Sequence, residues 1–226
     1  MHLFFDLDNT VTRSRSKITP ELKELLSTTP HTVIIVSGAV CSQIAWQTDG
    51  IICYKLGQNG NHALTPDDAV LWEERLSKAD EETIHAHIHS IQRTWPVTDE
   101  NDLVQDRGCQ ISYSLLGHKE NLEKKEAFDP YGEVRKKLLS AYPFESNDLD
   151  VKIGGTTCLD YTAKGKHKGF YVARLIHQMA WDPEECIYFG DMLFPGGNDE
   201  SVIGVIKTQA VENPEDTLAQ LIALHN

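Results

Sequence analysis

Three short, continuous apolar runs constrain the fold of this chain more than any other feature. They cover residues 2–6, 32–36 and 186–190, and an acidic or small polar residue closes or follows each run. Unbroken apolar runs of this length are typical of strands buried on both faces of a parallel sheet. Helical stretches at 20–28 and 40–46 follow the first two runs. This alternation predicts an α/β fold with a Rossmann-like, doubly wound parallel sheet, whose site lies at the carboxyl ends of the strands.

The middle of the chain breaks this alternation. It contains a helical stretch at 81–94, alternating strands around 109–116, a second helical stretch at 128–141 and an alternating strand at 150–160. Long helices mixed with antiparallel strands are typical of a separate α+β module. We therefore predict a catalytic core formed by residues 1–79 and 163–226, with residues 80–162 inserted into it as an α+β cap domain.

The composition argues against several classes of protein. The net charge of -13 opposes nonspecific binding to nucleic acid or to an anionic membrane, because both are polyanions. The longest apolar runs are far shorter than the roughly 20 residues that span a bilayer. The N-terminus lacks the basic and apolar regions of a signal peptide, and the five cysteines form no C-x-x-C pair. We expect a cytoplasmic protein with reduced thiols and a small-molecule substrate.

Two acidic residues stand at the end of the first apolar run, in the segment Asp6-Leu7-Asp8-Asn9-Thr10. Residues i and i+2 of an extended segment point in the same direction, so we expect two carboxylates in one site. In a phosphoryl transfer the first carboxylate can attack phosphorus, while the second donates and accepts protons. Asp and Asn also cap turns and helices, and this alternative explains the short motif equally well when it is taken alone.

A second polar cluster, at 190–199, follows the third apolar run. Asp191 and Asp199 offer hard oxygen ligands that suit Mg2+, and the alternative is an ordinary glycine-rich loop that caps the following helix. Lys168 begins another helical stretch and can hold a phosphate or a carboxylate by its charge. Ser37 can donate its hydroxyl to a phosphate, or it can cap the next helix. Acidic strand ends from opposite ends of the chain favour one shared site.

Taken together, these residues resemble the four motifs of the haloacid dehalogenase superfamily in their order along the chain. The motifs are Asp6-x-Asp8-x-Thr10, Ser37-Gly38, Lys168, and Gly190-Asp191 with Asn198-Asp199. The resemblance spans the whole chain and implies a phosphoryl-transfer enzyme with Mg2+ as its cofactor. It implies that Asp6 is the nucleophile, that Asp8 is the acid and base, and that Lys168 and Ser37 hold the phosphoryl group. The magnesium ligands that follow from it are Asp6, Asp8, Asp191 and Asp199.

Within that superfamily the chain resembles the eukaryotic-type phosphomannomutases. This resemblance rests on the segment 194–199 (Phe-Pro-Gly-Gly-Asn-Asp), on Arg-x-Lys-Ile at 15–18, and on Ile-Gly-Gly at 153–155 with Asp160 eight residues before Lys168. It implies a large cap before the lysine, an arginine near the sugar at Arg15, and substrate contacts by Arg107 and Asp160 of the cap. The substrate-binding residues that we expect are Thr10, Arg15, Ser37, Gly38, Arg107, Lys125 and Asp160.

Three cap positions depart from the mutase pattern. His118 and Lys125 stand where the mutases carry arginines, and Cys158 stands where they carry a serine. A mutase must hold a second phosphate in its cap, which favours the paired hydrogen bonds of arginine. We therefore predict a phosphatase that uses water as the acceptor and acts on a small phosphorylated sugar or polyol. The alternatives are a phosphosugar mutase and a binding protein on an inactive enzyme scaffold.

A group of histidines offers a further candidate metal site. The histidines at 85, 87 and 89 lie in one predicted helix, whose isoleucines at 84, 88 and 91 form an apolar stripe. His85 and His89 have the spacing of a metal-binding pair, but the sequence places no third ligand in register with them. We therefore expect this helix to pack against a core rather than to bind a metal.

Overall fold

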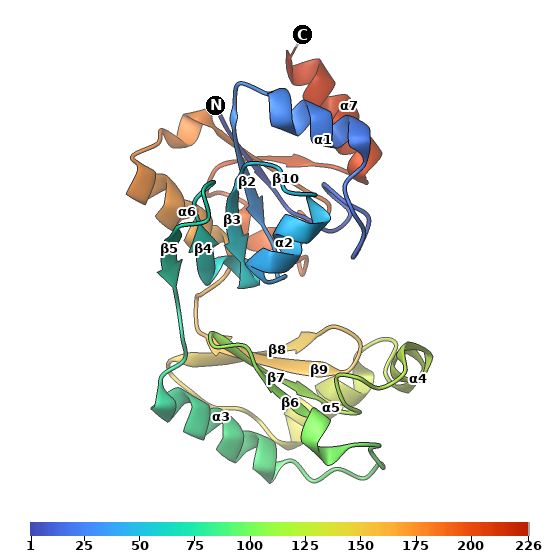
Figure 1. The fold of residues 1–226 in the computed structure, drawn as a ribbon. Coiled ribbons are helices and arrows are strands. Elements are labelled where there is room, and N and C mark those ends of the chain that lie inside the picture. Colours follow the sequence, from blue (N-terminus) through green and yellow to red (C-terminus); the bar gives the residue numbers. More distant parts are fainter. Residues whose placement is uncertain (226) are drawn as a thin grey trace. The chain divides into compact units, whose positions relative to one another are not determined.

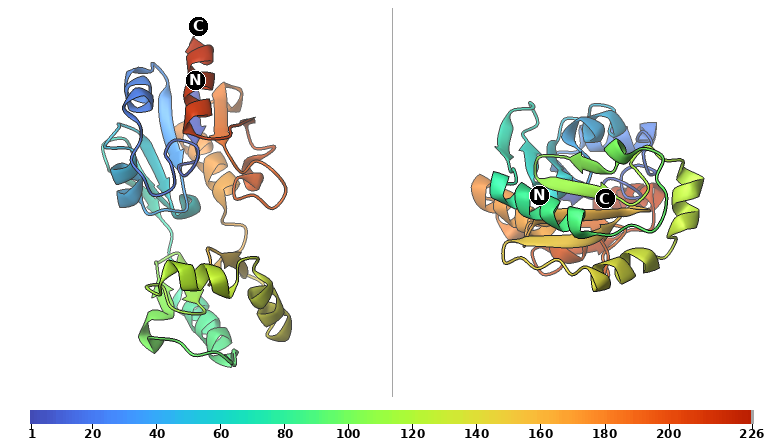
Figure 2. Two further views of the ribbon diagram at one scale, coloured as in Figure 1. Left: turned by 90° about the vertical axis from the view of Figure 1, so that its right-hand side faces the viewer. Right: turned by 90° about the horizontal axis from the view of Figure 1, so that it is seen from below.

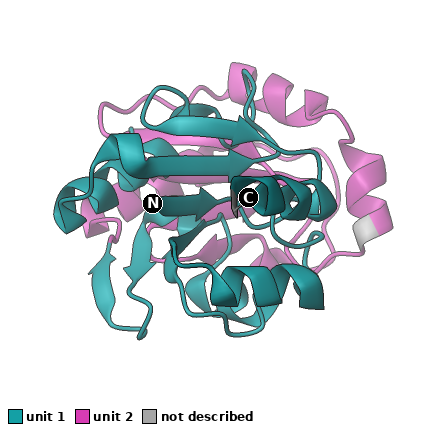
Figure 3. Ribbon diagram, turned by 90° about the horizontal axis from the view of Figure 1, so that it is seen from above, with its two compact units in different colours: residues 1–73, 165–226 teal, residues 74–164 magenta. Residues whose placement is uncertain are grey.

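The computed structural model describes residues 1–225, and the chain forms two compact units (Figure 3). One unit contains residues 1–73 and 165–226, and the other contains residues 74–164. We call them the core and the cap. The chain passes between the units at 73/74 and 164/165, whereas the sequence suggested 79/80 and 162/163. No helix within the described residues is both long enough and apolar enough to cross a membrane.

The core contains one seven-stranded sheet in the order β11-β10-β1-β2-β3-β4-β5 (Figure 1). Its strands are β1 (His2–Phe5), β2 (Thr32–Val36), β3 (Tyr54–Gly57), β4 (His62–Leu64), β5 (Val70–Glu73), β10 (Cys186–Gly190) and β11 (Lys207–Ala210). The first three strands, β10 and β11 are paired in parallel, whereas β4 and β5 extend the sheet as an antiparallel edge. This is the doubly wound α/β arrangement that the apolar runs predict.

Helices cover both faces of this sheet, which explains why its central strands are apolar without interruption. Leu3 and Phe5 of β1 point into one cluster of buried side chains, and Phe4 points into the other. The first cluster includes residues of α1 (Pro20–Thr28), α2 (Cys41–Gln47) and α7 (Pro214–His225), and the second includes residues of α6 (Lys168–Met179). Short 3-10 turns complete the core at Gln58–Gly60, Pro183–Glu185 and Glu200–Val202.

The register of the parallel strands decides where the polar strand ends meet. Phe5 pairs with Ile35 on one side and with Phe189 on the other. The residues that follow β1, β2 and β10 therefore emerge at one edge of the sheet, and the next elements along the chain begin there. Asp6 and Asp191 are brought to this edge from opposite ends of the sequence.

The cap is an α+β unit with a four-stranded antiparallel sheet in the order β6-β7-β9-β8. Its strands are β6 (Val104–Asp106), β7 (Gln110–Ser114), β8 (Leu149–Gly154) and β9 (Cys158–Ala163). Its helices are α3 (Lys78–Ser90), α4 (Leu122–Phe128) and α5 (Glu133–Ala141), with a 3-10 turn at Glu100–Asp102. In Figure 1, α3 is the blue-green helix of this unit, and Figure 2 gives two further views of the ribbon.

Three predicted cap elements differ from those observed. The single strand expected at 150–160 is a hairpin of β8 and β9, because Gly155 adopts a positive φ and reverses the chain. The helix expected at 128–141 begins only at Glu133, after Gly132 in the left-handed region, and α4 ends at Phe128. The expected helix 81–94 runs from Lys78 to Ser90, since Ser77 and Asp80 form a capping box at its start.

The two faces of the cap sheet differ in polarity. Ile111, Leu159 and Tyr161 are buried in a cluster with Ile84 and Ile88 of α3. The apolar stripe predicted for this helix is therefore confirmed. His87, on the same helix, forms hydrogen bonds with Tyr161 Oη (2.8 Å) and the carbonyl of Tyr142 (2.9 Å), so it serves the packing of the cap. The opposite face carries polar side chains, among them Ser112 and Asp160.

Candidate active site

Asp6 is the first residue after β1 and is almost completely buried. Its N–H donates to the carbonyl of Phe189 at 2.9 Å, which continues the pairing of β1 with β10. Only 3% of the residue is exposed. A carboxylate in such a position needs a charged or hydrogen-bonding partner to remain ionised.

That partner is Lys168, at the first position of α6. Its ammonium lies 2.5 Å from Oδ1 of Asp6 and 2.8 Å from Oδ1 of Asp199. The lysine is 1% exposed, so both ion pairs are shielded from water. The side chain of His167 caps α6 by accepting the N–H of Phe170, which fixes the start of the helix at this lysine.

Asp199 has two further contacts that hold it against the sheet. The hydroxyl of Tyr188 donates to its Oδ1 at 2.6 Å, and the N–H of Met192 donates to its Oδ2 at 3.4 Å. Gly190 leaves the space that this carboxylate fills, because a Cβ there would lie 2.5 Å from Oδ2 of Asp199. Tyr188 is not recognisable as a site residue in the sequence, because its position within an apolar strand gives no sign of a polar contact.

Three carboxylates converge on this position. Ligand oxygens of Asp6, Asp191 and Asp199 all lie within 4.8 Å of one another. Among the described ion pairs, Lys168 is the one basic residue that contacts these carboxylates. Negative charge is therefore in excess. Oxygen donors with excess negative charge fit a hard divalent cation such as Mg2+. The carboxylate of Asp8 is not part of this group in residues 1–225.

Burial and mutual repulsion raise the pKa of two carboxyl groups of this cluster. Burial raises the pKa of Asp6 to about 7, and the charges of Asp199 and Asp191 add to this rise, although Lys168 opposes it. Burial and the charge of Asp199 also raise the pKa of Asp191, which is half-buried. Without a cation, the carboxyl groups of the cluster therefore tend to be protonated, and a bound cation would favour their ionised form.

Asp8 lies in the loop after β1, and its side chain has a different set of partners. Its Oδ1 accepts the N–H of Arg15 at 2.9 Å and the side-chain amide of Gln47 at 3.1 Å. Arg15 itself has a positive φ of 53° and an exposed side chain. Oδ1 of Asp8 therefore holds the loop that follows β1 in place, and its Oδ2 has no described hydrogen bond.

The predicted phosphate-binding residues of the core are placed near strand ends. The hydroxyl of Ser37, directly after β2, accepts the N–H of Ala39 at 3.1 Å, so it also caps the following turn. Gly38 is exposed beside it. Thr10 is fully buried, and its hydroxyl has no hydrogen-bond partner among the described residues. An unsatisfied hydroxyl of this kind fits a role in positioning the loop or a bound group.

The remaining predicted substrate residues belong to the cap. Arg107 donates from Nε and Nη2 to the side chain of Gln105, at 3.0 and 2.8 Å. The ammonium of Lys125 donates to the carbonyl of His118 at 2.6 Å. Asp160 accepts the hydroxyl of Ser112, which is a contact that the sequence did not indicate.

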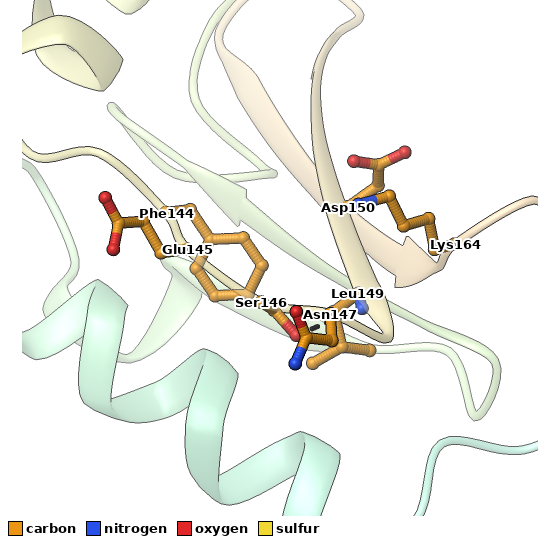
Figure 4. A pocket seen from close by; sticks show the side chains of 7 residues that line it. All are labelled: Phe144, Glu145, Ser146, Asn147, Leu149, Asp150 and Lys164. Atoms are coloured by element: carbon orange, nitrogen blue, oxygen red, sulfur yellow. Dashed lines mark hydrogen bonds between the residues drawn. The ribbon is translucent and has the colours of Figure 1, made fainter.

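A separate hollow lies at one end of the cap sheet (Figure 4). Its lining includes Phe144, Glu145, Asp150 and Lys164. Figure 4 shows the carboxylates of Glu145 and Asp150 on opposite sides of the hollow, pointing away from each other. They do not form a group of converging ligands, so the acidic cluster of the core is the better candidate for chemistry.

Comparison with known proteins agrees with this assignment. The family model of the haloacid dehalogenase-like hydrolases matches residues 3–220. The chain is 27% identical to a phosphomannomutase of Spinacia oleracea, over 96% of this chain and 92% of that protein. It is 25% identical to a phosphomannomutase of Schizosaccharomyces pombe, over 99% of this chain and 94% of that protein.

Solved structures show the same fold at lower sequence identity. A haloacid dehalogenase-like hydrolase from B. subtilis aligns with a TM-score of 0.67 at 14% identity, covering 99% of this chain and 100% of that one. A sugar phosphatase of haloacid dehalogenase subclass IIB aligns with a TM-score of 0.63 at 15% identity, covering 99% and 98%. The family match over almost the whole chain shows that this protein belongs to the haloacid dehalogenase-like hydrolases, as a phosphoryl-transfer enzyme of that family.

Proposed function

We propose that this protein is a Mg2+-dependent phosphatase that acts through an aspartyl-phosphate on a small phosphorylated sugar or polyol. The observation that carries the proposal is the buried bridge of Lys168 between Asp6 and Asp199, beside Asp191. It gathers a nucleophile, a cation for phosphate and a set of hard oxygen ligands in one place. A binding protein on an inactive scaffold would have no need to retain all of them.

The proposed reaction has two displacements at phosphorus. An oxygen of Asp6 attacks phosphorus, the bond to the leaving alcohol oxygen breaks, and Asp8 donates a proton to that oxygen. Water then attacks the phosphorus of the aspartyl-phosphate, gives a proton to Asp8, and releases phosphate with the carboxylate of Asp6 restored. Oδ2 of Asp8 is the atom that we assign to the proton, because Oδ1 accepts the hydrogen bonds of the loop.

The other residues of the core hold the charges in place. Asp6, Asp191 and Asp199 would bind Mg2+, with Asp8 as a further candidate ligand from the sequence. When bound, Mg2+ would offset the excess negative charge and stabilise the charge that develops on the transferring phosphoryl group. The ammonium of Lys168 offsets the charge repulsion between Asp6 and Asp199, and it offers a positive charge to the phosphate. Thr10, Ser37, Gly38 and Arg15 are the proposed phosphate-side contacts of the core.

The cap residues decide between water and a second sugar hydroxyl as the acceptor. A mutase must hold a second phosphate in its cap, which favours the paired hydrogen bonds of arginine. The ammonium of Lys125 donates to the carbonyl of His118, and Nε2 of His118 donates to the carbonyl of Ser112 at 3.0 Å. Neither side chain offers the paired donors of a guanidinium. This favours hydrolysis, with Arg107 and Asp160 as the proposed sugar contacts. The names of the curated relatives favour the alternative, a phosphomannomutase.

One activity panel separates these functions. Phosphosugars, polyol phosphates and nucleotides are supplied with Mg2+, with and without a hexose bisphosphate, and both phosphate release and isomer formation are measured. We expect phosphate release from a sugar or polyol phosphate and no efficient isomer formation. Efficient interconversion of mannose 1-phosphate and mannose 6-phosphate that depends on the bisphosphate would replace the phosphatase by the mutase. No turnover of any compound would count against catalysis.

Asp6→Asn tests the covalent mechanism in the same panel. The amide keeps the shape of the side chain but cannot form the acyl phosphate, so we expect activity to disappear. Asp67→Asn is the matched control, because Asp67 is exposed and accepts only the hydroxyl of Thr65 among its described side-chain contacts.

The five cysteines are free thiols within the described residues, which fits the cytoplasmic location that forms part of this proposal.

A further inference from the structure

The strand register of the cap aligns four polar residues in one row across the sheet. Gln105 of β6 pairs with Ser112 of β7, Ser112 pairs with Asp160 of β9, and Asp160 pairs with Lys152 of β8. Residues that are directly opposite each other in antiparallel strands place their side chains on the same face. All four side chains therefore lie on the face opposite to Ile111 and Leu159, which belong to the apolar cluster of the cap.

Part of this row is already connected by hydrogen bonds. The hydroxyl of Ser112 donates to Oδ1 of Asp160 at 2.5 Å, and Arg107 donates twice to the side chain of Gln105. Ser112 is fully buried, so its hydroxyl fixes the carboxylate from a rigid position. The row thus joins the two cap residues that the sequence singled out, Arg107 and Asp160, to neighbours that it did not.

Oδ2 of Asp160 has room beside β8 because Gly154 of that strand carries no side chain. A Cβ on Gly154 would lie 1.9 Å from Oδ2 of Asp160, so the carboxylate occupies the space above this glycine. Gly154 is two residues from Lys152 on the same strand, and both lie on the polar face. The carboxylate of Asp160 therefore leans toward the strand that carries Lys152.

Lys152 is exposed, and its ammonium makes no hydrogen bond or ion pair with any residue in the described range 1–225. The ammonium of Lys125, by contrast, is held by the carbonyl of His118. Lys152 thus supplies a free cation on the polar face, next to a carboxylate that is held in place on one side only.

We propose that Lys152 and Asp160 form a specificity-determining pair that binds hydroxyl groups of the sugar or polyol end of the substrate. An ionised carboxylate can only accept hydrogen bonds and an ammonium can only donate them, whereas each hydroxyl does both. Together the two side chains complement adjacent hydroxyls, and Lys152 is the new member of the site. This inference rests on the proposed function, because it names the part of the substrate that the cap selects.

The test measures binding and turnover separately. The dissociation constants of a panel of hexose phosphates and polyol phosphates are measured by calorimetry with Mg2+ in an Asp6→Asn background, with Lys152→Met added or not. We expect Lys152→Met to weaken the binding of the preferred compound by about tenfold or more, as for a lost hydrogen bond of a charged group. In the protein with Asp6 intact, the same change should raise KM and leave kcat nearly unchanged.

A deoxy analogue of the preferred compound shows whether the lost contact is to a hydroxyl. Removing the contacted hydroxyl should weaken binding to the unchanged cap, and Lys152→Met should cause no further loss with that analogue. Lys136→Met is the matched control, because Lys136 is an exposed lysine of α5 that pairs only with Glu133 among the described contacts. It should leave every dissociation constant unchanged.

The outcomes separate this inference from the proposed function. If sugar phosphates bind Lys152→Met and Lys136→Met equally well, the inference is wrong, whatever the turnover shows. If phosphate is released by the protein with Asp6 intact in that case, the phosphatase assignment stands alone. If Lys152→Met weakens binding but no phosphate is released from any compound, the inference stands and the phosphatase assignment fails.

Discussion

The ammonium of Lys168 lies 2.5 Å from Oδ1 of Asp6, although 162 positions separate the two residues in the chain. The same ammonium binds Asp199, so one buried cation balances carboxylates from β1 and from the loop after β10. Burying three carboxylates and one ammonium together is unfavourable unless each finds a partner. The arrangement therefore depends on this lysine for stability as well as for chemistry.

Lys168→Met should reduce both activity and stability. Without the ammonium, Asp6 and Asp199 face each other as buried like charges, and removal of one partner of a buried ion pair costs about 3–5 kcal/mol. We expect a loss of turnover of about 10²–10³-fold, as for removal of a group that stabilises transition-state charge. Urea denaturation and a phosphatase assay measure the two effects. Lys136→Met, on the surface of the cap, should change neither.

The raised pKa of Asp6 predicts how pH and Mg2+ act together. The folded protein raises the pKa of Asp6 to about 7. Between the usual carboxyl pKa and pH 7 the metal-free folded state therefore holds a proton that the unfolded state has released, and it loses this advantage as the pH rises. Stability in EDTA should therefore fall as the pH rises from 5 to 8, and Mg2+ should stabilise more at pH 8 than at pH 5, since its ligands must be deprotonated. Thermal melting with EDTA or Mg2+ measures this.

Asp6→Asn provides the control for that prediction. It removes the carboxyl group whose pKa is raised to about 7 and keeps the size of the side chain, so the pH dependence of the stabilisation by Mg2+ should become smaller. Asp191 retains its own raised pKa, so some pH dependence should remain. An equal stabilisation by Mg2+ at pH 5 and pH 8 in the unchanged protein would contradict the link between Asp6 and the metal.

The parts of the fold that the sequence predicts are those whose burial is continuous. Strands β1, β2 and β10 are buried on both faces, so their apolar runs mark them and the residues at their ends directly. The edge strand β11 carries polar residues and β4 has only three residues, so no apolar run identifies either strand. The β8–β9 hairpin alternates in polarity through its turn, so it resembles one strand.

The candidate site divides in a similar way. Asp6, Lys168 and Asp199 are polar residues at element ends, which is the pattern that indicates a shared site. Tyr188 lies inside a buried strand, where a tyrosine is expected to pack, and only the three-dimensional position of Asp199 reveals the use of its hydroxyl. The position of Lys152 opposite Asp160 follows from strand register, which depends on contacts between distant segments.

A buried ion pair in the cap should make that unit sensitive to acid. Arg135 Nε donates to Asp129 at 2.7 Å, and both side chains are almost fully buried. Arg135 also donates to the carbonyls of Gly154 and Gly155, which holds the turn before β9. Burial alone would raise the pKa of Asp129, but hydrogen bonds from Arg135 and from the N–H of Val134 outweigh it and lower this pKa.

The pair therefore stabilises the folded protein above the usual pH range of carboxyl titration, and this contribution is lost as the pH falls through the lowered pKa of Asp129. Arg135→Met should lower the free energy of unfolding at neutral pH by about 3–5 kcal/mol, because it leaves Asp129 buried without its partner. The loss should shrink when Asp129 is protonated. Urea denaturation at pH 7 and at the lowest pH that retains the fold measures this, and an equal loss at both would contradict it.

The hydroxyl of Tyr188 offers the sharpest test of the acidic cluster, because its removal changes one hydrogen bond and no charge. Tyr188→Phe should leave the sheet intact and loosen Asp199, whose carboxylate then keeps, among the described contacts, Lys168 and the weak contact with Met192. Partners that orient metal ligands typically contribute tenfold to 100-fold to metal affinity, so the Mg2+ concentration for half-maximal activity should rise by about that factor. Tyr171→Phe is the matched control, since the buried hydroxyl of Tyr171 donates to the neutral side chain of Asn61 at 2.7 Å. A similar rise for both variants would mean that loss of packing, rather than release of Asp199, weakens the metal site.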